Sequence, residues 1–281
     1  MAPKKMGVVI TTYNQPRWLK KVLFGYEAQR HTGFTVIVAD DGSDQPTRDV
    51  IDFFRGRGKL DLQHIWHEDR GFRKCEILNK AIAQSDCDYL IFTDGDCIPE
   101  PDFVSTHQSL AEPGHFLSGG YVKLTTPVSE RISEADIASG VIFDIDWLVA
   151  AGQPSSRKLW KLFKSRGVKF LLNAMTPTRA TWNGMNSSTW MSDIKACNGF
   201  NEDMQYGGLD REFGERLSNH GLKGKQARYS VNCLHLDHPR SYDNPENWKK
   251  NYAIRNDVKL SGKSWAANGI LKEGRTAEVE T

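Results

Sequence analysis

Two aspartates near residue 95 are the first candidates for chemistry in this chain. Asp94 and Asp96 follow the apolar run YLIF at 89–92 and are separated only by Gly95. Carboxylate oxygens on so short a turn suit Mg²⁺ or Mn²⁺ bridging a diphosphate. An Asp-Gly turn after a strand is the ordinary alternative, and the tripeptide taken alone favours that turn. The interpretation therefore depends on which other residues join the pair.

Aspartates and histidines elsewhere in the chain could join it. Asp40 and Asp41 end a second apolar run in VIVADDGS. Far downstream, CLHLDHPR places His235 three residues before His238. A histidine returning to a carboxylate pair would complete a site that accepts a transition metal. Each histidine singly is ordinarily a surface or core residue, whereas the combination favours a metal site.

A further aspartate could act as a base. Asp210 follows two glycines in YGGLDREFGERL and precedes an apolar-periodic helix. Its ordinary role would be the N-cap of that helix. A carboxylate facing a cleft at a helix start could equally be a general base. The helix dipole would then lower the pKa of Asp210 and keep the carboxylate ionised.

A regular alternation of strands and helices in residues 1–125 must position these side chains. Strands are expected at 7–13, 34–43, 60–68 and 89–96, and helices at 16–29, 46–55, 73–84 and 101–110. Such spacing predicts an α/β fold of βαβ units with a mainly parallel sheet. Ligands bind at the carboxyl ends of strands in these sheets. The polar clusters fall at those ends, which indicates one shared site.

The alternation stops beyond residue 124. Residues 129–172 are expected to be helical and irregular, and one further helix is expected at 210–219. The polar end, KEGRTAEVET, is expected to be disordered. The predicted organisation is a domain at 1–240, followed by a helical extension and polar tail at 241–281. Within the domain we expect a nucleotide-binding half, a helical insertion, and an acceptor and catalytic half, at 1–125, 126–178 and 179–240.

The composition fits a globular protein with a real core. The chain has 281 residues, 39% of them apolar, and a net charge of +2, which does not indicate a nucleic-acid partner. It contains no apolar run of roughly 18 residues, as a membrane-spanning helix requires. The apolar run near the N-terminus is too short for a signal peptide. The five cysteines are scattered and are expected to be reduced thiols in a cytoplasmic protein.

One stretch, RKLWKLFKSRGVKFLL at 157–172, combines six basic residues with apolar and aromatic ones and has no acid. This pattern indicates a membrane-surface element or a groove for an acidic partner. A core-packed helix with a solvated basic face is an equally weighted alternative. On the membrane interpretation, the protein would lie peripherally at the inner face of the cytoplasmic membrane and its acceptor could be lipid-linked.

The common phosphate-binding loops are absent from the sequence. Neither GxGxxG nor GxxxxGKS/T follows the first strand, so classical dinucleotide and P-loop sites are excluded. A ligand that carries phosphates must then be neutralised in another way, for which a divalent cation on Asp94 and Asp96 would serve.

The spacings together resemble family 2 glycosyltransferases with the GT-A fold, with a C-terminal segment like that of the β-1,4-galactosyltransferases. The resemblance covers residues 6–240 apart from about 128–175. It rests on VVITTYNQPRWL, VIVADDGS, HEDRGFRKCEILNKAI, YLIFTDGDCIPEPDF, NGMNSSTWMSDIKACNGFNEDMQYGGLDREFGERL and CLHLDHP.

The resemblance implies roles on the donor side. Asp94 and Asp96 would form the DxD motif around Gly95, with Asp96 on the metal and Asp94 on the ribose or on metal-bound waters. His238 would bind the same Mn²⁺ or Mg²⁺, and His235 could be a second ligand. The nucleoside and diphosphate would be bound by Thr11, Thr12, Tyr13, Asp41 (to the uracil imide), Arg73 and Asn79.

Roles on the acceptor side follow from the same resemblance. Asn186, Gly208 and the NGF turn at 198–200 would shape the sugar and acceptor pocket. Asp210 would be the catalytic base of the GGxD motif. The galactosyltransferases have Glu-Asp where this chain has Leu209-Asp210, which removes one sugar-contacting carboxylate and leaves the donor sugar open.

The implied reaction is metal-dependent, inverting transfer from a UDP-sugar to a hydroxyl of a glycan or lipid-linked glycan. Bacterial cell-surface polysaccharide or lipopolysaccharide synthesis is the expected setting. A sugar-phosphate nucleotidyltransferase is one rival, but it would need a glycine- and arginine-rich first loop, and TTYNQPRW lacks one. A non-catalytic nucleotide- or carbohydrate-binding module on the same fold is the other rival.

Overall fold

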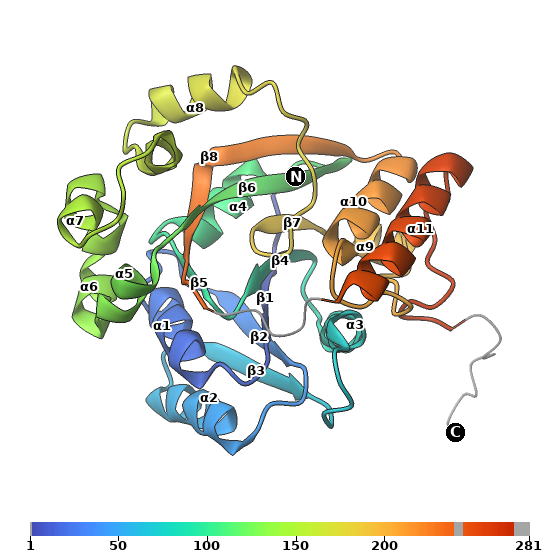
Figure 1. Cartoon of the computed structure of the whole chain (residues 1–281), viewed down its shortest axis with the longest axis horizontal. Coiled ribbons are helices and arrows are strands. Elements are labelled where there is room, and N and C mark those ends of the chain that lie inside the picture. The colour runs from blue at the N-terminus through green and yellow to red at the C-terminus, as the bar shows by residue number, and fades with distance from the viewer. Residues whose placement is uncertain (1, 239–243, 273–281) are drawn as a thin grey trace.

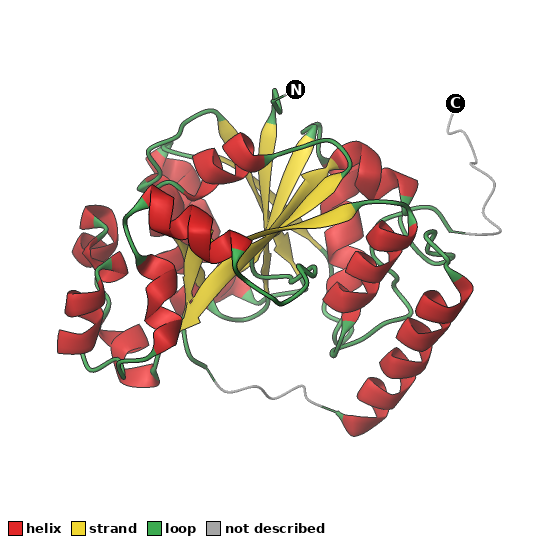
Figure 2. Ribbon diagram, turned by 90° about the horizontal axis from the view of Figure 1, so that it is seen from above, coloured by secondary structure: helices red, strands yellow, loops and turns green. Residues whose placement is uncertain are grey.

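A computed structural model describes residues 2–238 and 244–272 (Figure 1). Figure 2 shows a twisted central sheet with helices on both faces. The order of the eight strands is β3-β2-β1-β4-β7-β6-β8-β5. This mixed α/β architecture agrees with the predicted fold class.

The first four strands are parallel, as the sequence predicts. They are β1 (Met6–Thr12), β2 (Phe34–Asp40), β3 (Asp61–Trp66) and β4 (Tyr89–Asp94). In their register, Thr12 lies opposite Asp40 and Thr11 opposite Asp94. The chain reversals after β1, β2 and β4 therefore start at one edge of the sheet, which brings their polar residues together.

The other four strands introduce antiparallel pairing. They are β5 (Cys97–Pro99), β6 (His115–Lys123), β7 (Ser187–Trp190) and β8 (Lys223–His235). Strand β7 runs antiparallel to both β4 and β6, whereas β8 is parallel to β6 and antiparallel to β5. Cys97 pairs with His235 in this register. A short strand directly after Asp96 thus places the aspartate beside the end of β8.

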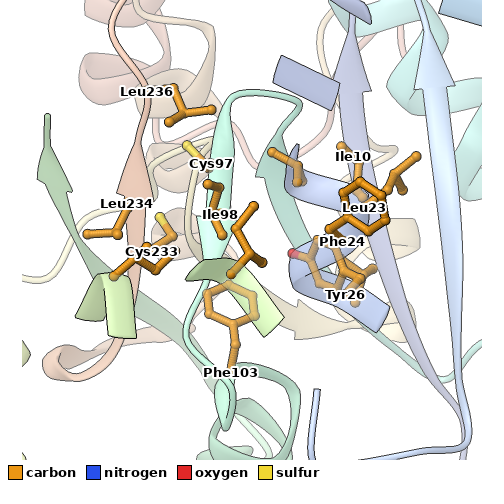
Figure 3. Packing of buried hydrophobic residues seen from close by; sticks show 14 of the residues in the cluster. Ile10, Leu23, Phe24, Tyr26, Cys97, Ile98, Phe103, Cys233, Leu234 and Leu236 are labelled. Atoms are coloured by element: carbon orange, nitrogen blue, oxygen red, sulfur yellow. The ribbon is translucent and has the colours of Figure 1, made fainter. Parts of the chain in front are cut away.

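Apolar residues on successive positions of β1 point into two separate cores. Val8 and Ile10 belong to the first core and Val9 to the second, as the period of two in a strand requires. Figure 3 shows part of the first core, where Ile98 of β5 and Cys233 of β8 lie near Phe103. All five cysteines are free, as the expectation of reduced thiols requires, and all five are buried.

The two cores are covered by different helices. The first core is covered by α1 (Pro16–Glu27), α2 (Gln45–Arg57) and α4 (Phe103–Leu110). The second is covered by α3 (Lys74–Gln84), α9 (Met191–Ala196) and α10 (Leu209–Asn219). Proline at the start of α1 and α2 fits the first turn, where the missing N–H costs no helical hydrogen bond.

The regular elements of the segment between β6 and β7 are all helices. These are α5 (Thr126–Arg131), α6 (Glu134–Ser139), η1 (Val141–Phe143), α7 (Ile145–Ala150), η2 (Arg157–Leu162) and α8 (Arg166–Ala174). Buried residues of the segment, such as Val128, Leu148 and Leu159, belong to the first core. The predicted insertion therefore packs on the first core, and its last elements, η2 and α8, also contact β8.

The C-terminal extension is a long helix, α11 (Pro245–Ser261), which lies alongside α10 (Figure 1). Arg255 of α11 donates two hydrogen bonds to Glu215 of α10, at 2.6 and 3.2 Å. The predicted polar tail lies outside the described residues from 273 onward. None of the described helices has the length and apolar character to span a membrane.

Candidate active site

A cavity of about 710 Å³ lies at the carboxyl ends of β1 and β4. Its walls include most of the residues predicted for the site. These are Thr11, Thr12, Tyr13, Asp41, Asp94, Gly95, Asp96, Gly208, Asp210, His235 and His238. Arg73, Asn79 and Asn186 do not line it.

Asp96, His235 and His238 form a cluster that could hold a metal ion. One ligand atom from each residue lies within 4.8 Å of the other two. The Nε2 atom of His238 is 2.8 Å from Asp96 Oδ2, and that of His235 is 3.6 Å from the same oxygen. The backbone amide of Leu236 donates to the Asp96 carbonyl at 2.8 Å, which continues the pairing of β5 with β8 past its last rung.

The cluster has the chemistry of a divalent transition-metal site. Burial by itself would raise the pKa of Asp96, but the hydrogen bond from His238 and the nearby His235 lower it, so the carboxylate is ionised. The Nδ1 atom of His235 is buried and has no hydrogen-bond partner among the described residues. Two imidazoles and one carboxylate fit Mn²⁺ well, whereas Mg²⁺ prefers oxygen ligands.

Asp94 is held by Lys74, which was not predicted from the sequence to be a site residue. Its Oδ1 accepts hydrogen bonds from Lys74 Nζ and Thr11 Oγ1, both at 2.6 Å. Burial alone would lower the pKa of Lys74, but Asp94, Asp210 and Asp96 together raise it. The cavity thus contains a fixed ammonium group among three carboxylates.

Lys74 occupies the place that was predicted for Arg73. The Arg73 guanidinium donates to Glu76 Oε2 at 3.0 Å and to the Glu68 carbonyl, away from the cavity. Only the backbone amide of Arg73 serves the site, because it donates to Asp41 Oδ2 at 2.9 Å. The prediction for the Arg73 side chain is therefore corrected.

Asp41 is a wall of the cavity with both oxygens engaged. His67 Nε2 lies 2.7 Å from its Oδ1, opposite the bond from the Arg73 amide to Oδ2. Burial raises the pKa of Asp41, and the contact with His67 opposes that rise. The predicted hydrogen bond from the uracil imide to Asp41 is compatible with this placement, because each carboxylate oxygen has more than one lone pair.

Asn79 is a structural residue in this fold. Its side chain exchanges two hydrogen bonds with the backbone of Phe200, each 2.8 Å long, and donates to Glu202 at 2.9 Å. These bonds attach α3 to the turn at 198–200, which also lies outside the cavity lining. The predicted roles of Asn79 at the ribose and of this turn at the acceptor are therefore corrected.

Asn186 is likewise buried away from the cavity. Its Nδ2 donates to the carbonyls of Gly120 and Val231 at 2.7 and 3.1 Å, and its Oδ1 is 2.9 Å from His107 Nε2. The pairing of β6 with β8 shifts register between Gly119 and Gly120. Asn186 satisfies backbone groups at that irregularity instead of shaping a sugar pocket.

Asp210 lies in the first turn of α10, after two glycines with positive φ. Gly207 has φ 107° and Gly208 has φ 81°, and Gly208 is the N-cap. The Oδ1 atom of Asp210 is buried without a hydrogen-bond partner in the described chain. A Cβ added at Gly184 would lie 2.5 Å from this oxygen, so the carboxylate fills space that only a glycine leaves open.

The direction of the pKa shift of Asp210 differs from the prediction. Burial raises its pKa and Asp94 adds to the rise, while Lys74 opposes it. Desolvation is the largest cause of the rise, whereas the helix dipole was expected to lower this pKa. A carboxylate with a raised pKa and an uncommitted oxygen is well suited to accept a proton.

An aromatic wall completes the cavity. Phe72, Tyr206 and Trp248 all line it, and Tyr206 makes edge contacts with Phe72 and Trp248 at centroid distances of 5.9 and 6.1 Å. None of these three residues was predicted from the sequence. Tyr206, which stands directly before the two glycines, carried a local signal, whereas Trp248 reaches the cavity only through the packing of α11.

Solved structures of similar shape define the class of fold. The chain matches residues 1–349 of S. aureus TarS in complex with UDP-GlcNAc with a TM-score of 0.62 at 15% identity, covering 96% of this chain and 68% of that one. It also matches the mannosyltransferase PcManGT of Pyrobaculum calidifontis, in complex with GDP-Man and Mn²⁺, with a TM-score of 0.57 at 17% identity. That match covers 92% of this chain and 62% of the other. The fold is thus the GT-A fold of nucleotide-sugar transferases.

Sequence comparison then gives the family. Residues 7–123 match the model of Glycosyl transferase family 2. A validoxylamine A glucosyltransferase of Streptomyces hygroscopicus subsp. jinggangensis is 28% identical over 256 residues, which cover 85% of this chain and 57% of that protein. Residues 7–123 therefore form a family 2 glycosyltransferase domain, and the chain spans little more than half the length of this relative.

Proposed function

We propose that this protein transfers a sugar from a UDP-sugar to a hydroxyl of a glycan or lipid-linked glycan, with inversion and with a divalent metal. Bacterial cell-surface polysaccharide or lipopolysaccharide synthesis is the proposed setting. The observation that carries the proposal is one cavity that contains both the Asp96, His235 and His238 cluster and the uncommitted oxygen of Asp210.

The donor side of the cavity would hold the nucleotide. Asp96, His235 and His238 would bind Mn²⁺, or less favourably Mg²⁺, and the bound cation would stabilise negative charge on the leaving diphosphate. Lys74 offers a second positive charge in the same cavity for the phosphates. The segment Thr11–Tyr13 and Asp41 form the wall at the ends of β1 and β2, where a nucleoside would lie.

Asp210 is the best candidate for the base because the other acids are engaged. Asp94 is bonded to Lys74 and Thr11, and Asp96 to His238. In the reaction, the acceptor oxygen bonds to the anomeric carbon, the bond from that carbon to the UDP oxygen breaks, and UDP leaves with the electron pair. The acceptor proton passes to Asp210. A single base without a nucleophilic carboxylate gives inversion.

The relatives support a nucleotide-sugar donor in general and do not select one. One solved neighbour is in complex with UDP-GlcNAc, and another is in complex with GDP-Man and Mn²⁺. Our preference for UDP rests on Asp41, which the family resemblance assigns to the uracil imide. Our preference for Mn²⁺ rests on the two imidazoles of the metal cluster.

A donor screen tests the proposal. Purified protein is incubated with a panel of UDP- and GDP-sugars, with Mn²⁺, Mg²⁺ or a chelator, and nucleoside diphosphate release is measured. We expect release from one UDP-sugar, faster with Mn²⁺ than with Mg²⁺ and lost with the chelator. Release confined to GDP-sugars, or unaffected by the chelator, would contradict it. Formation of pyrophosphate from UTP and a sugar phosphate would favour the nucleotidyltransferase rival instead.

A further inference from the structure

Helix α8 presents its apolar side to solvent. It lies over β8 at the edge of the molecule (Figure 1). Phe170 is 76% exposed and Met175, directly after the helix, is 69% exposed, and Val168 and Leu171 are exposed as well. An ordinary surface helix buries such a face against the core.

The polar side of α8 makes the contacts with the body of the protein. Asn173 donates to Ser230 Oγ at 2.7 Å and accepts from the Tyr229 amide at 2.9 Å. Lys169 lies 3.7 Å from Glu100, a buried carboxyl whose pKa burial raises to about 7. The helix is thus anchored by polar bonds on one side, which holds its apolar residues outward.

The surrounding sequence is positively charged. No acid occurs from residue 147 to residue 192. The same span contains Arg157, Lys158, Lys161, Lys164, Arg166, Lys169 and Arg179. Lys164 pairs with Asp144 at 2.8 Å and Lys169 with Glu100 at 3.7 Å, whereas Arg157 and Lys158 in η2 are exposed.

An aromatic pair and further charge connect η2 to the same face. Trp160 is partly exposed and stacks on Phe163, with 6.1 Å between ring centroids. Burial lowers the pKa of Lys161, and the positive charges of Arg228 and Lys158 lower it further. Aromatic rings beside basic side chains are typical of segments that lie in a membrane interface.

We propose that η2 and α8 form a docking face for a membrane surface that carries anionic lipid headgroups. The apolar residues of α8 would enter the interface, and Arg157 and Lys158 would contact the headgroups. A second copy of the chain is a poorer occupant, because two such basic faces would repel each other. The inference is independent of the proposed sugar transfer, although it would place the site next to lipid-linked acceptors.

Sedimentation with vesicles tests the inference without any turnover. The full chain is mixed with vesicles of phosphatidylcholine alone, or of phosphatidylcholine with phosphatidylglycerol, at low and high salt. We expect binding to the anionic vesicles that decreases as salt increases. The double variant Phe170→Glu with Leu171→Glu, and separately Arg157→Glu with Lys158→Glu, should each weaken binding at least about tenfold.

Leu260→Glu is the matched control, because Leu260 is 81% exposed on α11, outside this face. It should bind like the unchanged protein, and all variants should keep the same UDP release in solution, which also shows that they fold. Absence of binding to anionic vesicles would overturn the inference. Equal binding to both vesicle types would also overturn it, as would equally weak binding by Leu260→Glu. A dimer detected by light scattering that dissociates in the Phe170→Glu with Leu171→Glu variant would overturn it as well.

Discussion

At the scale of single residues, the environment of Asp210 differs from that of the other acids in the cavity. It has a buried oxygen without a hydrogen-bond partner in the described residues, and desolvation raises its pKa. A buried carboxylate oxygen without a hydrogen bond costs stability. Its retention beside Lys74 is consistent with a proton-accepting role, for which an uncommitted oxygen is needed.

Asp210→Asn should reduce transfer by roughly 10²–10⁴-fold, the range for loss of a general base. Metal-dependent UDP binding, measured by calorimetry, should stay intact because Asp210 is not one of the metal-cluster residues. In the unchanged protein, transfer should fall as pH decreases through the raised pKa of Asp210, because only the ionised carboxylate accepts a proton.

The variant should also be at least as stable as the unchanged protein near neutral pH. A raised pKa in the folded state means that ionisation of Asp210 opposes folding above that pKa, and asparagine removes the charge. Near-normal turnover by Asp210→Asn would exclude Asp210 as the base, whereas loss of UDP binding would mean that it acts on the donor.

At the scale of elements, α11 determines the shape of the loop that precedes α10. The Asn251 side-chain amide lies within hydrogen-bonding distance of three successive carbonyls, those of Gln205, Tyr206 and Gly207, at 3.0, 3.1 and 2.7 Å. A Cβ on Gly207 would lie 2.8 Å from the Trp248 ring. The C-terminal extension therefore holds the two glycines that lead into Asp210.

Asn251→Ala should lower the free energy of unfolding by about 1–3 kcal/mol, because it leaves buried carbonyls without a donor. UDP release should fall as well, since the loop no longer holds Tyr206 and Gly208 in the cavity wall. Denaturant titration and the donor assay measure the two effects.

Asn256→Ala is the control for this variant, because Asn256 is exposed on the same helix. It should change neither quantity measurably. If Asn251→Ala and Asn256→Ala proved equally stable and equally active, α11 would not be needed to position the loop.

At the scale of the whole molecule, the metal cluster links the two halves of the sheet. Asp96 follows β4 in the parallel half, whereas His235 and His238 come from the end of β8. A cation bound by all three would bind the folded chain and not the unfolded one. By mass action, a ligand at a hundredfold excess over its Kd adds about 2.7 kcal/mol to stability.

Mn²⁺ should therefore raise the Tm by several degrees in differential scanning calorimetry. Asp96→Ala should abolish this shift, and Asp146→Ala, which removes an exposed acid in α7, should leave it unchanged. An equal rise in the Tm of Asp96→Ala would place the cation elsewhere.

Much of the fold could be predicted from local patterns, because a parallel βαβ unit leaves its period in the sequence. The four strands and four helices predicted for the first 125 residues lie where the alternation places them, whereas β6 (His115–Lys123) was not predicted. Strand β5 was missed because Cys97–Pro99 is too short to show a period. The pairing of β7 with β4 was missed because it joins segments about a hundred residues apart.

The site residues could be predicted where a short sequence motif forms the stretch of backbone that lines the cavity. The turn with Asp94 and Asp96, the glycines before Asp210, and the two histidines after β8 are of this kind. Arg73 and Lys74 show the limit of such reasoning, because neighbouring residues at a helix start point about 100° apart. The sequence indicated a cation there, and only the tertiary structure shows that it is Lys74.

The sequence by itself determined the order of the chemical groups: the paired aspartates, the base candidate after its glycines, and the histidines at the end. These are local in the chain, so a short motif is enough to specify them. The tertiary structure alone decided which side chains face the cavity, that Asn79 and Asn186 bond to backbone instead, and that Trp248 joins the wall. Those outcomes depend on packing between distant segments, where burial and backbone hydrogen bonding set the direction of each side chain.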